Sequence, residues 1–492
     1  MSAADGMRWS EAFVRSALGL PPAEGPGYAV ISTDTRTLVP GALFVALAGE
    51  RFDAHGFLAQ ARDAGARAAV VRRGTPAVEG LALLEVDDTL RALGDLANAR
   101  RREIAGPVVG ITGTNGKTST KEMVAAVLRT RYRVHATRAN LNNLVGVPTT
   151  ILEAPADTGA LVVEAGANLP GEIPRYREII SPSIALVTNV GEGHLEGFGS
   201  LDGVMREKLA LVRDVPLAVV GTDPAALADG ARRLAGRVVT AGLAGADVAP
   251  GALELDELGR ASFTVDGRHV RLPVAGRHLA ANSMLAWAVV RELGLDPAAA
   301  AEALCALSMP GGRSEIVQAG GLTILNDCYN ANPLSFRAAI ATAATMRRGR
   351  RLVFVAGTMR ELGAASSRRH WSRTARRSAS DCSRRPIRWR SGPRCASGSR
   401  ATRWWCSRHP GAWPWSVYFR SWRPCRLPAR LRLTEARCST TGSLRSGSST
   451  SSSISSTTSA SGRRAPRSPR CCSPSWSGPR SSRGCGRTRS DR

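Results

Sequence analysis

A glycine-rich segment that ends in lysine and threonine carries the clearest chemical signal in this sequence. Residues 110–119 read GITGTNGKTS and precede a helical pattern that starts at 120. Glycines let backbone N–H groups close around phosphate oxygens, while a lysine serves the outer phosphates and a threonine hydroxyl suits Mg²⁺. The segment therefore predicts a nucleotide-phosphate site at a helix N-terminus. Its residues are Gly113, Thr114, Asn115, Gly116, Lys117, Thr118 and Ser119.

The spacing departs from the strict P-loop pattern at one position. That pattern places glycine six residues before the lysine, where this chain has Ile111. A glycine turn with a solvated lysine stays open as an alternative, although an apolar run before the loop and a helix after it favour the phosphate site.

Short apolar runs alternating with helical patterns must position this segment. Runs 42–47 and 68–71 predict strands, and 57–64 predicts a helix that ends at Gly65. They form a small α/β domain over residues 1–104. Continuous apolar runs, typical of strands buried on both faces of a parallel sheet, predict a central domain over 105–309. These runs are 161–163, 184–187 and 217–220.

A third domain begins near residue 310 and loses its pattern after about 370. Residues 322–325 and 352–356 predict strands, and 335–346 predicts a helix. Residues 371–492 show no sustained period. The fold class is therefore α/β up to residue 370.

The formal net charge of +27 is concentrated in the C-terminal part. Residues 365–492 hold 29 arginines, no lysine and three acids, a net of +26, whereas the first 364 residues net to +1. Eight of the ten cysteines and eight of the ten tryptophans also lie there. A disordered basic tail rarely carries so many aromatic residues, and no Cys-x-x-Cys pair indicates zinc. The absence of lysine favours an out-of-frame translation of GC-rich DNA over both of those alternatives.

The rest of the chain indicates a cytoplasmic protein. Two cysteines before residue 365 suggest a reducing compartment, the N-terminus lacks a signal-peptide pattern, and no apolar run is long enough to span a membrane.

Residues 32–370 resemble the Mur ligases of peptidoglycan synthesis, and among them the members that add D-alanyl-D-alanine. The blocks that carry the resemblance are 32–36, 40–57, 112–118, 140–150, 193–198, 276–282, 312–313, 327–335 and 359–370. The resemblance implies a three-domain architecture: a UDP-sugar-binding domain, a P-loop domain, and a Rossmann-like ligase domain, here truncated.

The resemblance also implies roles for individual residues. Lys117, Lys208 and His194 are catalytic, and Lys208 is carbamylated. Mg²⁺ is held by Thr118, Glu164, His194 and Lys208. ATP is bound by the phosphate loop with Asn282, Arg313 and Asp327. The substrate residues are Thr35, Arg36, Asn140, Asn142, Asn143, Asn330 and Asn332.

The implied reaction is ATP-dependent formation of an amide through an acyl phosphate. The partners are a UDP-N-acetylmuramoyl-tripeptide and D-Ala-D-Ala, and we expect a monomer that binds no nucleic acid. Because the third domain is cut short, we expect poor folding past residue 370 and little or no ligase activity. The alternatives are an intact ligase with a harmless tail, a folylpolyglutamate synthase-like ligase, and an ATPase body with a basic nucleic-acid-binding tail.

Overall fold

The N-terminal part of the chain is built on a small parallel sheet. The computed structural model describes residues 8–49, 52–356 and 416–420. The strands lie in the order β1-β2-β5-β6, and both predicted strands and the predicted helix of this region are confirmed as β2, β5 and α2. The elements are α1 (Glu11–Ala17), β1 (Ile31–Ser32), η1 (Thr35–Thr37), β2 (Ala42–Val45), β3 (Ala48–Gly49), β4 (Phe52–Asp53), η2 (Ala54–Phe57), α2 (Leu58–Asp63), β5 (Ala66–Arg72), β6 (Ala82–Val86) and α3 (Thr89–Arg102).

The central part contains a six-stranded parallel sheet in the order β12-β11-β10-β7-β9-β8. The three apolar runs predicted as buried strands are confirmed as β9, β10 and β11. The elements up to β12 are β7 (Val108–Thr112), α4 (Lys117–Leu128), β8 (Val134–Ala136), α5 (Gly146–Leu152), β9 (Ala160–Glu164), α6 (Glu172–Ile180), β10 (Ile184–Val187), α7 (Leu195–Phe198), α8 (Leu201–Leu209), η3 (Ala210–Val212), β11 (Leu217–Gly221), α9 (Ala226–Arg232) and β12 (Arg237–Ala241).

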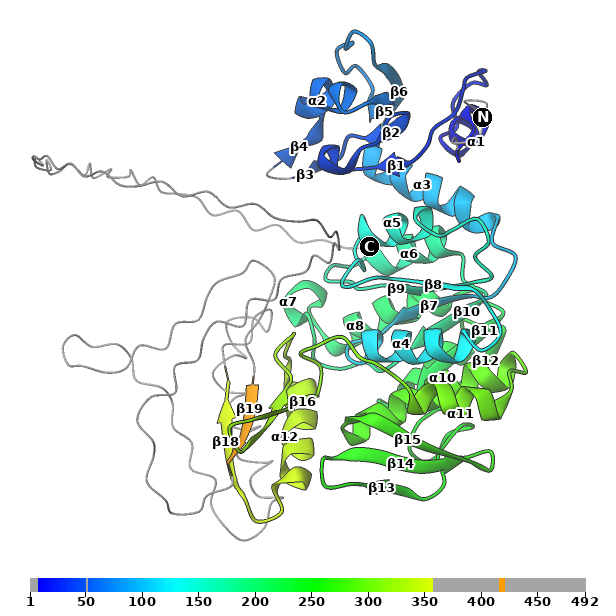
Figure 1. Ribbon diagram of the computed structural model, residues 1–492. Coiled ribbons are helices and arrows are strands. Elements are labelled where there is room, and N and C mark those ends of the chain that lie inside the picture. The colour runs from blue at the N-terminus through cyan, green and yellow to red at the C-terminus, as the bar shows by residue number, and fades with distance from the viewer. Residues whose placement is uncertain (1–7, 50–51, 357–415, 421–492) are drawn as a thin grey trace, which may run out of the picture. The chain divides into compact units, whose positions relative to one another are not determined.

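Alternate residues of the central strands pack on opposite faces of the sheet, which explains why the runs are apolar throughout. In β9, Leu161 and Val163 join a core cluster with α5 and α6, whereas Ala160 and Val162 join a cluster with α4 and α10 (Arg277–Glu292). Figure 1 shows the two helical layers on either side of the sheet. The carboxyl ends of β7, β9 and β10 lie at one edge, where parallel sheets bind ligands.

A three-stranded antiparallel sheet follows, which was not predicted from the sequence. It has the order β13-β14-β15 and is succeeded by α10 and a shorter helix. The elements are β13 (Leu253–Leu255), β14 (Arg260–Val265), β15 (Arg268–Ala275) and α11 (Pro297–Cys305).

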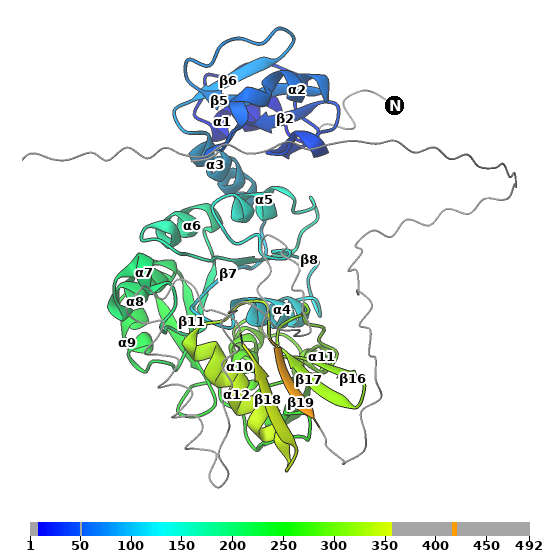
Figure 2. The same cartoon turned by 90° about the vertical axis from the view of Figure 1, so that its left-hand side faces the viewer.

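The third part pairs α12 (Pro333–Arg347) with an antiparallel sheet in the order β16-β17-β19-β18 (Figure 2). The two strands and the helix predicted here are confirmed as β17, β18 and α12. The strands are β16 (Glu315–Ala319), β17 (Leu322–Asn326), β18 (Arg351–Val355) and β19 (Ser416–Arg420). The backbone of β19 lies between β17 and β18, within the segment 371–492 that showed no sequence period. The rest of that segment lies outside the described residues.

No helix within the described ranges is long and apolar enough to cross a membrane.

Candidate active site

A cavity of about 520 Å³ lies where the central sheet edge meets the third part of the chain. Every residue predicted for the nucleotide or the metal lines it except Gly113 and Lys208. The five asparagines predicted for substrate line it as well. Thr35 and Arg36 are not among its lining residues. They lie on η1 of the N-terminal domain, where Arg36 is exposed and pairs with Asp34 at 2.6 Å.

The loop between β7 and α4 requires glycine at two positions. Gly113 and Gly116 have φ of 141° and 79°. A Cβ on Gly113 would lie 2.0 Å from the Thr188 hydroxyl oxygen, and one on Gly116 would lie 2.8 Å from the Asn282 amide. Both the backbone conformation and the close approach exclude side chains there. The loop itself therefore lies against the residues that follow β10 and against α10.

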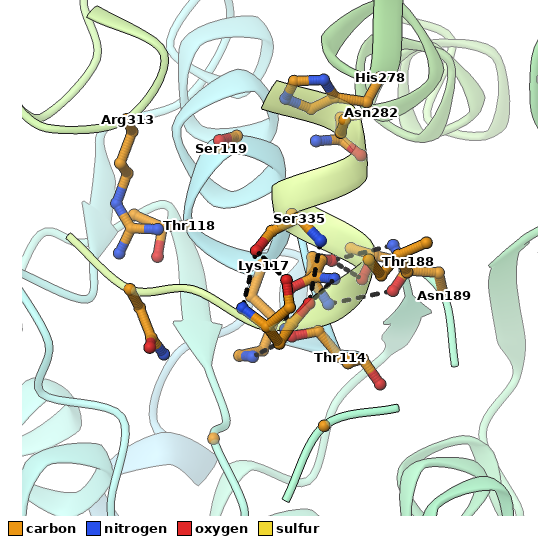
Figure 3. Close-up of a pocket in the computed structure, with 18 of the residues that line it drawn as sticks. Thr114, Lys117, Thr118, Ser119, Thr188, Asn189, His278, Asn282, Arg313 and Ser335 are labelled. Carbon is orange, nitrogen blue, oxygen red and sulfur yellow. Dashed lines mark hydrogen bonds between the residues drawn. The ribbon is translucent and has the colours of Figure 1, made fainter. Parts of the chain in front are cut away.

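Residues at the end of β10 hold the loop backbone in place (Figure 3). The Asn115 N–H donates to Asn189 Oδ1 at 3.0 Å, and the Asn115 carbonyl accepts from Asn189 Nδ2 at 3.1 Å and from Thr188 Oγ1 at 2.5 Å. Neither Thr188 nor Asn189 was predicted from the sequence as a site residue. Their position directly after a buried strand was the signal that could have found them.

Lys117, the first residue of α4, is folded back onto its own loop. Its Nζ donates to the carbonyls of Gly113 and Thr114 at 2.9 and 3.1 Å. Burial lowers the pKa of Lys117, the nearby Arg313 lowers it further, and Glu164 opposes both. The ammonium is thus already held at the loop that would receive phosphates.

Glu164, the last residue of β9, is held at both carboxylate oxygens. Thr118 Oγ1 donates to Oε2 at 2.8 Å and Asn142 Nδ2 donates to Oε1 at 2.9 Å. The Glu164 N–H donates to Thr137 Oγ1 at 3.0 Å. A carboxylate, a hydroxyl and an amide oxygen are hard donors of the kind that Mg²⁺ prefers.

His194 and Lys208 both lie in the segment after β10, but only His194 lines the cavity. His194 precedes α7 with a φ of 53° and lines the cavity. Lys208 lies in α8 with only 2% of its surface exposed; its Nζ donates to the Ala167 carbonyl at 3.4 Å and lies 5.6 Å from the centre of the Phe198 ring. Burial, reinforced by Lys117, lowers the pKa of Lys208 to about 7.

Helix α10 and the third part of the chain complete the cavity. Burial lowers the pKa of His278 to about 4. The Arg313 guanidinium lies 3.9 Å from the centre of the Tyr329 ring, a cation–π contact. Asp327 accepts the Ser314 N–H at 3.0 Å, and its burial raises the pKa of its carboxyl group.

Comparison with known proteins adds to this geometry. Three family models match: the Mur ligase family, catalytic domain, at residues 27–101; the Mur ligase middle domain at 111–290; and the Mur ligase, glutamate ligase domain, at 312–385. The UDP-N-acetylmuramoyl-tripeptide–D-alanyl-D-alanine ligase of Bacillus subtilis is 37% identical over 345 residues, which cover 68% of this chain and 74% of that protein.

The chain belongs to the Mur ligase family. It is an ATP-dependent peptide ligase, and the three-domain architecture expected from the resemblance is confirmed. The Escherichia coli ligase of the same name is 39% identical and is covered over 76% of its length. MurF from Acinetobacter baumannii has a similar structure, with a TM-score of 0.68 at 33% identity, over 76% of this chain and 83% of that one.

A MurF ligase from Thermotoga maritima, solved in complex with ADP, is similar with a TM-score of 0.63 at 28% identity. The match covers 71% of this chain and 82% of that one. This neighbour supports the use of an adenine nucleotide by the present Mur ligase.

Proposed function

We propose that this Mur ligase joins D-alanyl-D-alanine to a UDP-N-acetylmuramoyl-tripeptide, with ATP converting the tripeptide carboxylate into an acyl phosphate. Both substrates are named in the activity of the related ligases, which supports assigning them here. The observation that carries the proposal is that one cavity gathers the phosphate loop, the Glu164–Thr118 pair and the third-domain residue Arg313.

We assign the nucleotide to the phosphate loop, to α10 and to the third domain. Backbone N–H groups of residues 113–119 surround the phosphates, and Lys117 turns from its loop carbonyls to the outer phosphates. Asn282 of α10 lies toward the base, and Asp327 toward the ribose. Arg313 adds a second positive charge, which offsets the charge that spreads over the transferring phosphoryl group.

The residues present fit magnesium. Thr118 and Glu164 offer a hydroxyl and a carboxylate 2.8 Å apart, and both line the cavity. The described residues contain no cluster of three His, Cys, Asp or Glu side chains, so these two residues would hold Mg²⁺ together with phosphate oxygens and water. When bound, Mg²⁺ neutralises phosphate charge as phosphoryl transfer proceeds.

Lys208 is proposed to be carbamylated and, with His194, to support a second metal ion. Its amine would add to CO₂, forming an N–C bond and releasing one proton, so that a carboxylate replaces the ammonium. The buried position of Lys208 supports this, because burial lowers the pKa of the lysine and so favours the neutral amine, which is the form that adds to CO₂. An acid lies beside it at Glu207, which accepts the N–H groups of Gly171 and Ile173.

The remaining assignments concern the UDP-sugar and the peptide substrates. Thr35 and Arg36 are proposed for the UDP-sugar. Asn140, Asn142, Asn143, Asn330 and Asn332 are proposed for the peptide substrates, with the enzyme acting as a cytoplasmic monomer. Closure around the acyl phosphate excludes water that would otherwise hydrolyse it.

Binding by the full chain tests the proposal separately from turnover. We expect calorimetry to show binding of ATP with Mg²⁺ and of the UDP-tripeptide, and Lys117→Met to lose most of the ATP affinity. If neither ligand binds, the proposal is wrong. Folate with glutamate in place of the peptide substrates tests the folylpolyglutamate synthase-like alternative, and steeply salt-dependent DNA binding tests the nucleic-acid alternative.

A further inference from the structure

The side-chain amides of Asn115 and Asn332 bind each other between the phosphate loop and the third domain. Asn115 Nδ2 donates to Asn332 Oδ1 at 3.0 Å, and Asn332 Nδ2 donates to Asn115 Oδ1 at 2.6 Å. The two residues are 217 positions apart in the sequence. Each amide therefore acts as donor and acceptor toward the other, which fixes the relative orientation of the two side chains.

Each partner is itself anchored in its own domain. Asn332 is the N-cap of α12: its Oδ1 also accepts the Ser335 N–H at 2.9 Å, and the Asn332 N–H donates to Ser335 Oγ at 3.0 Å. This reciprocal capping box ties the amide to the start of the helix. On the other side, Thr188 and Asn189 hold the backbone of Asn115. The amide pair thus connects the end of β10 to the start of α12.

The connection matters because third-domain side chains must meet a ligand held by the central domain. Arg313 and Asp327 line the same cavity as the loop, and the charge of Arg313 is close enough to depress the pKa of Lys117. A neutral amide pair is well suited to this position, since a carboxylate there would repel phosphates and an ammonium would compete with Lys117 for them.

We propose that Asn115 and Asn332 form a positioning clasp that holds the third domain against the phosphate loop, so that Arg313 and Asp327 reach a nucleotide bound there. The clasp rests on the proposed function for its ligand. It gives Asn332 a positioning role through Asn115 and α12, beside the role proposed for it toward the peptide. Loss of the pair removes two neutral hydrogen bonds, which corresponds to about a tenfold change in an equilibrium constant.

The test separates the clasp from helix capping in the full chain. Asn332→Ser keeps a good N-cap residue but is too short to reach Asn115. Ser335→Ala removes the other half of the capping box without touching Asn115. We expect Asn332→Ser to weaken binding of Mg–ATP about tenfold, measured by calorimetry. Ser335→Ala should lower Tm by a similar amount but keep the Mg–ATP affinity within about twofold of the wild-type value.

A double-mutant cycle adds a second readout. Asn115→Ser and Asn332→Ser are expected to be non-additive, with the double variant binding no more weakly than the weaker single one. Wild-type affinity in Asn332→Ser, or fully additive losses, would overturn the clasp.

Hydrogen exchange without ligand distinguishes failure of the clasp from failure of the proposed function. Asn115→Ser lies outside the third domain, yet we expect it to speed backbone exchange over residues 327–336. Unchanged exchange there would refute the clasp even if the wild-type chain binds no ATP. Faster exchange combined with no ATP binding in the wild type would instead refute the nucleotide assignment and leave the clasp standing.

Discussion

At the residue scale, the site depends on side chains whose polar atoms are already engaged with one another. Glu164 is held at both oxygens by Thr118 and Asn142, so its carboxylate is fixed before any ligand arrives. The glycine loop predicted Thr118, and the family resemblance predicted Glu164. The sequence could not predict that Asn332 contacts Asn115, because that contact depends on how two domains meet.

The burial of Lys208 also lay beyond the sequence. A lysine in an amphipathic helix is ordinarily exposed. Its position near Phe198 and Ala167 results from packing of α8 against the segment that follows β9. Only the family resemblance marked it as special.

The Thr118 hydroxyl gives the first prediction. Its side chain is 3% exposed, so Thr118→Val fits the space but removes the donor to Glu164 and a Mg²⁺ ligand. We expect Thr118→Val to raise the Mg²⁺ concentration needed for half-maximal ATP binding by about tenfold or more, since hydrogen bonds to charged groups are the stronger ones. Thr118→Ser keeps the hydroxyl and should stay within about twofold. Equal behaviour of the two variants would contradict the assignment.

His278 gives a prediction on pH. Burial lowers its pKa to about 4, whereas an unfolded histidine titrates near 6.5. Between these values the unfolded chain binds the extra proton, so this residue makes stability fall as pH drops from about 6.5 to 4. We expect the Tm of His278→Gln to fall less than the Tm of the wild type over that pH range, with a difference of roughly 2 °C or more. Parallel Tm–pH curves would show that folding does not lower the pKa of His278.

At the scale of elements, periodicity predicted the parallel strands well, because both faces of the central sheet are covered. It failed for β13–β15, where short antiparallel strands have one covered face and mixed composition. Residues 253–255 show the difficulty: the pattern is half-buried, exposed, half-buried, which is too short to distinguish from a loop. Glycines in the sequence marked the positions of turns. At several of these glycines, close contacts leave no space for a side chain.

Gly146, the first residue of α5, offers a test at this scale. A Cβ there would lie 2.4 Å from the carbonyl carbon of Leu141 and 2.7 Å from its oxygen. Helix propensity alone predicts that Gly146→Ala stabilises the protein by about 1 kcal/mol. We expect the opposite, a fall in Tm of roughly 4 °C or more measured by calorimetry, because backbone cannot move aside easily. Gly56→Ala, where nothing lies within 4 Å, is the matched control.

At the scale of the whole molecule, the chain combines an electrically ordinary Mur ligase body with a strongly basic C-terminal segment. The net charge of residues 365–492 is +26, and apart from β19 that segment lies outside the described residues. A shifted reading frame, inferred from the composition of this segment, therefore stays a prediction. The glutamate ligase domain match nevertheless extends to residue 385.

The coding DNA provides the test of that prediction. We expect one of the other two frames beyond about codon 365 to encode an α/β continuation of the third domain. In that case the purified chain should bind ATP but form amide product far more slowly than a chain carrying the restored frame, measured as phosphate released with D-Ala-D-Ala present. Normal turnover by the chain as it stands would contradict this expectation.

The two carbonyl contacts of Lys117 have a final consequence for ligand discrimination. Because the ammonium already has acceptors at Gly113 and Thr114, an incoming molecule must replace them rather than satisfy an empty donor. A nucleoside monophosphate has no outer phosphate that could replace these carbonyls at the ammonium, so Lys117 does not contribute to its binding. Preference for triphosphate over monophosphate is thus built into the resting conformation of one side chain.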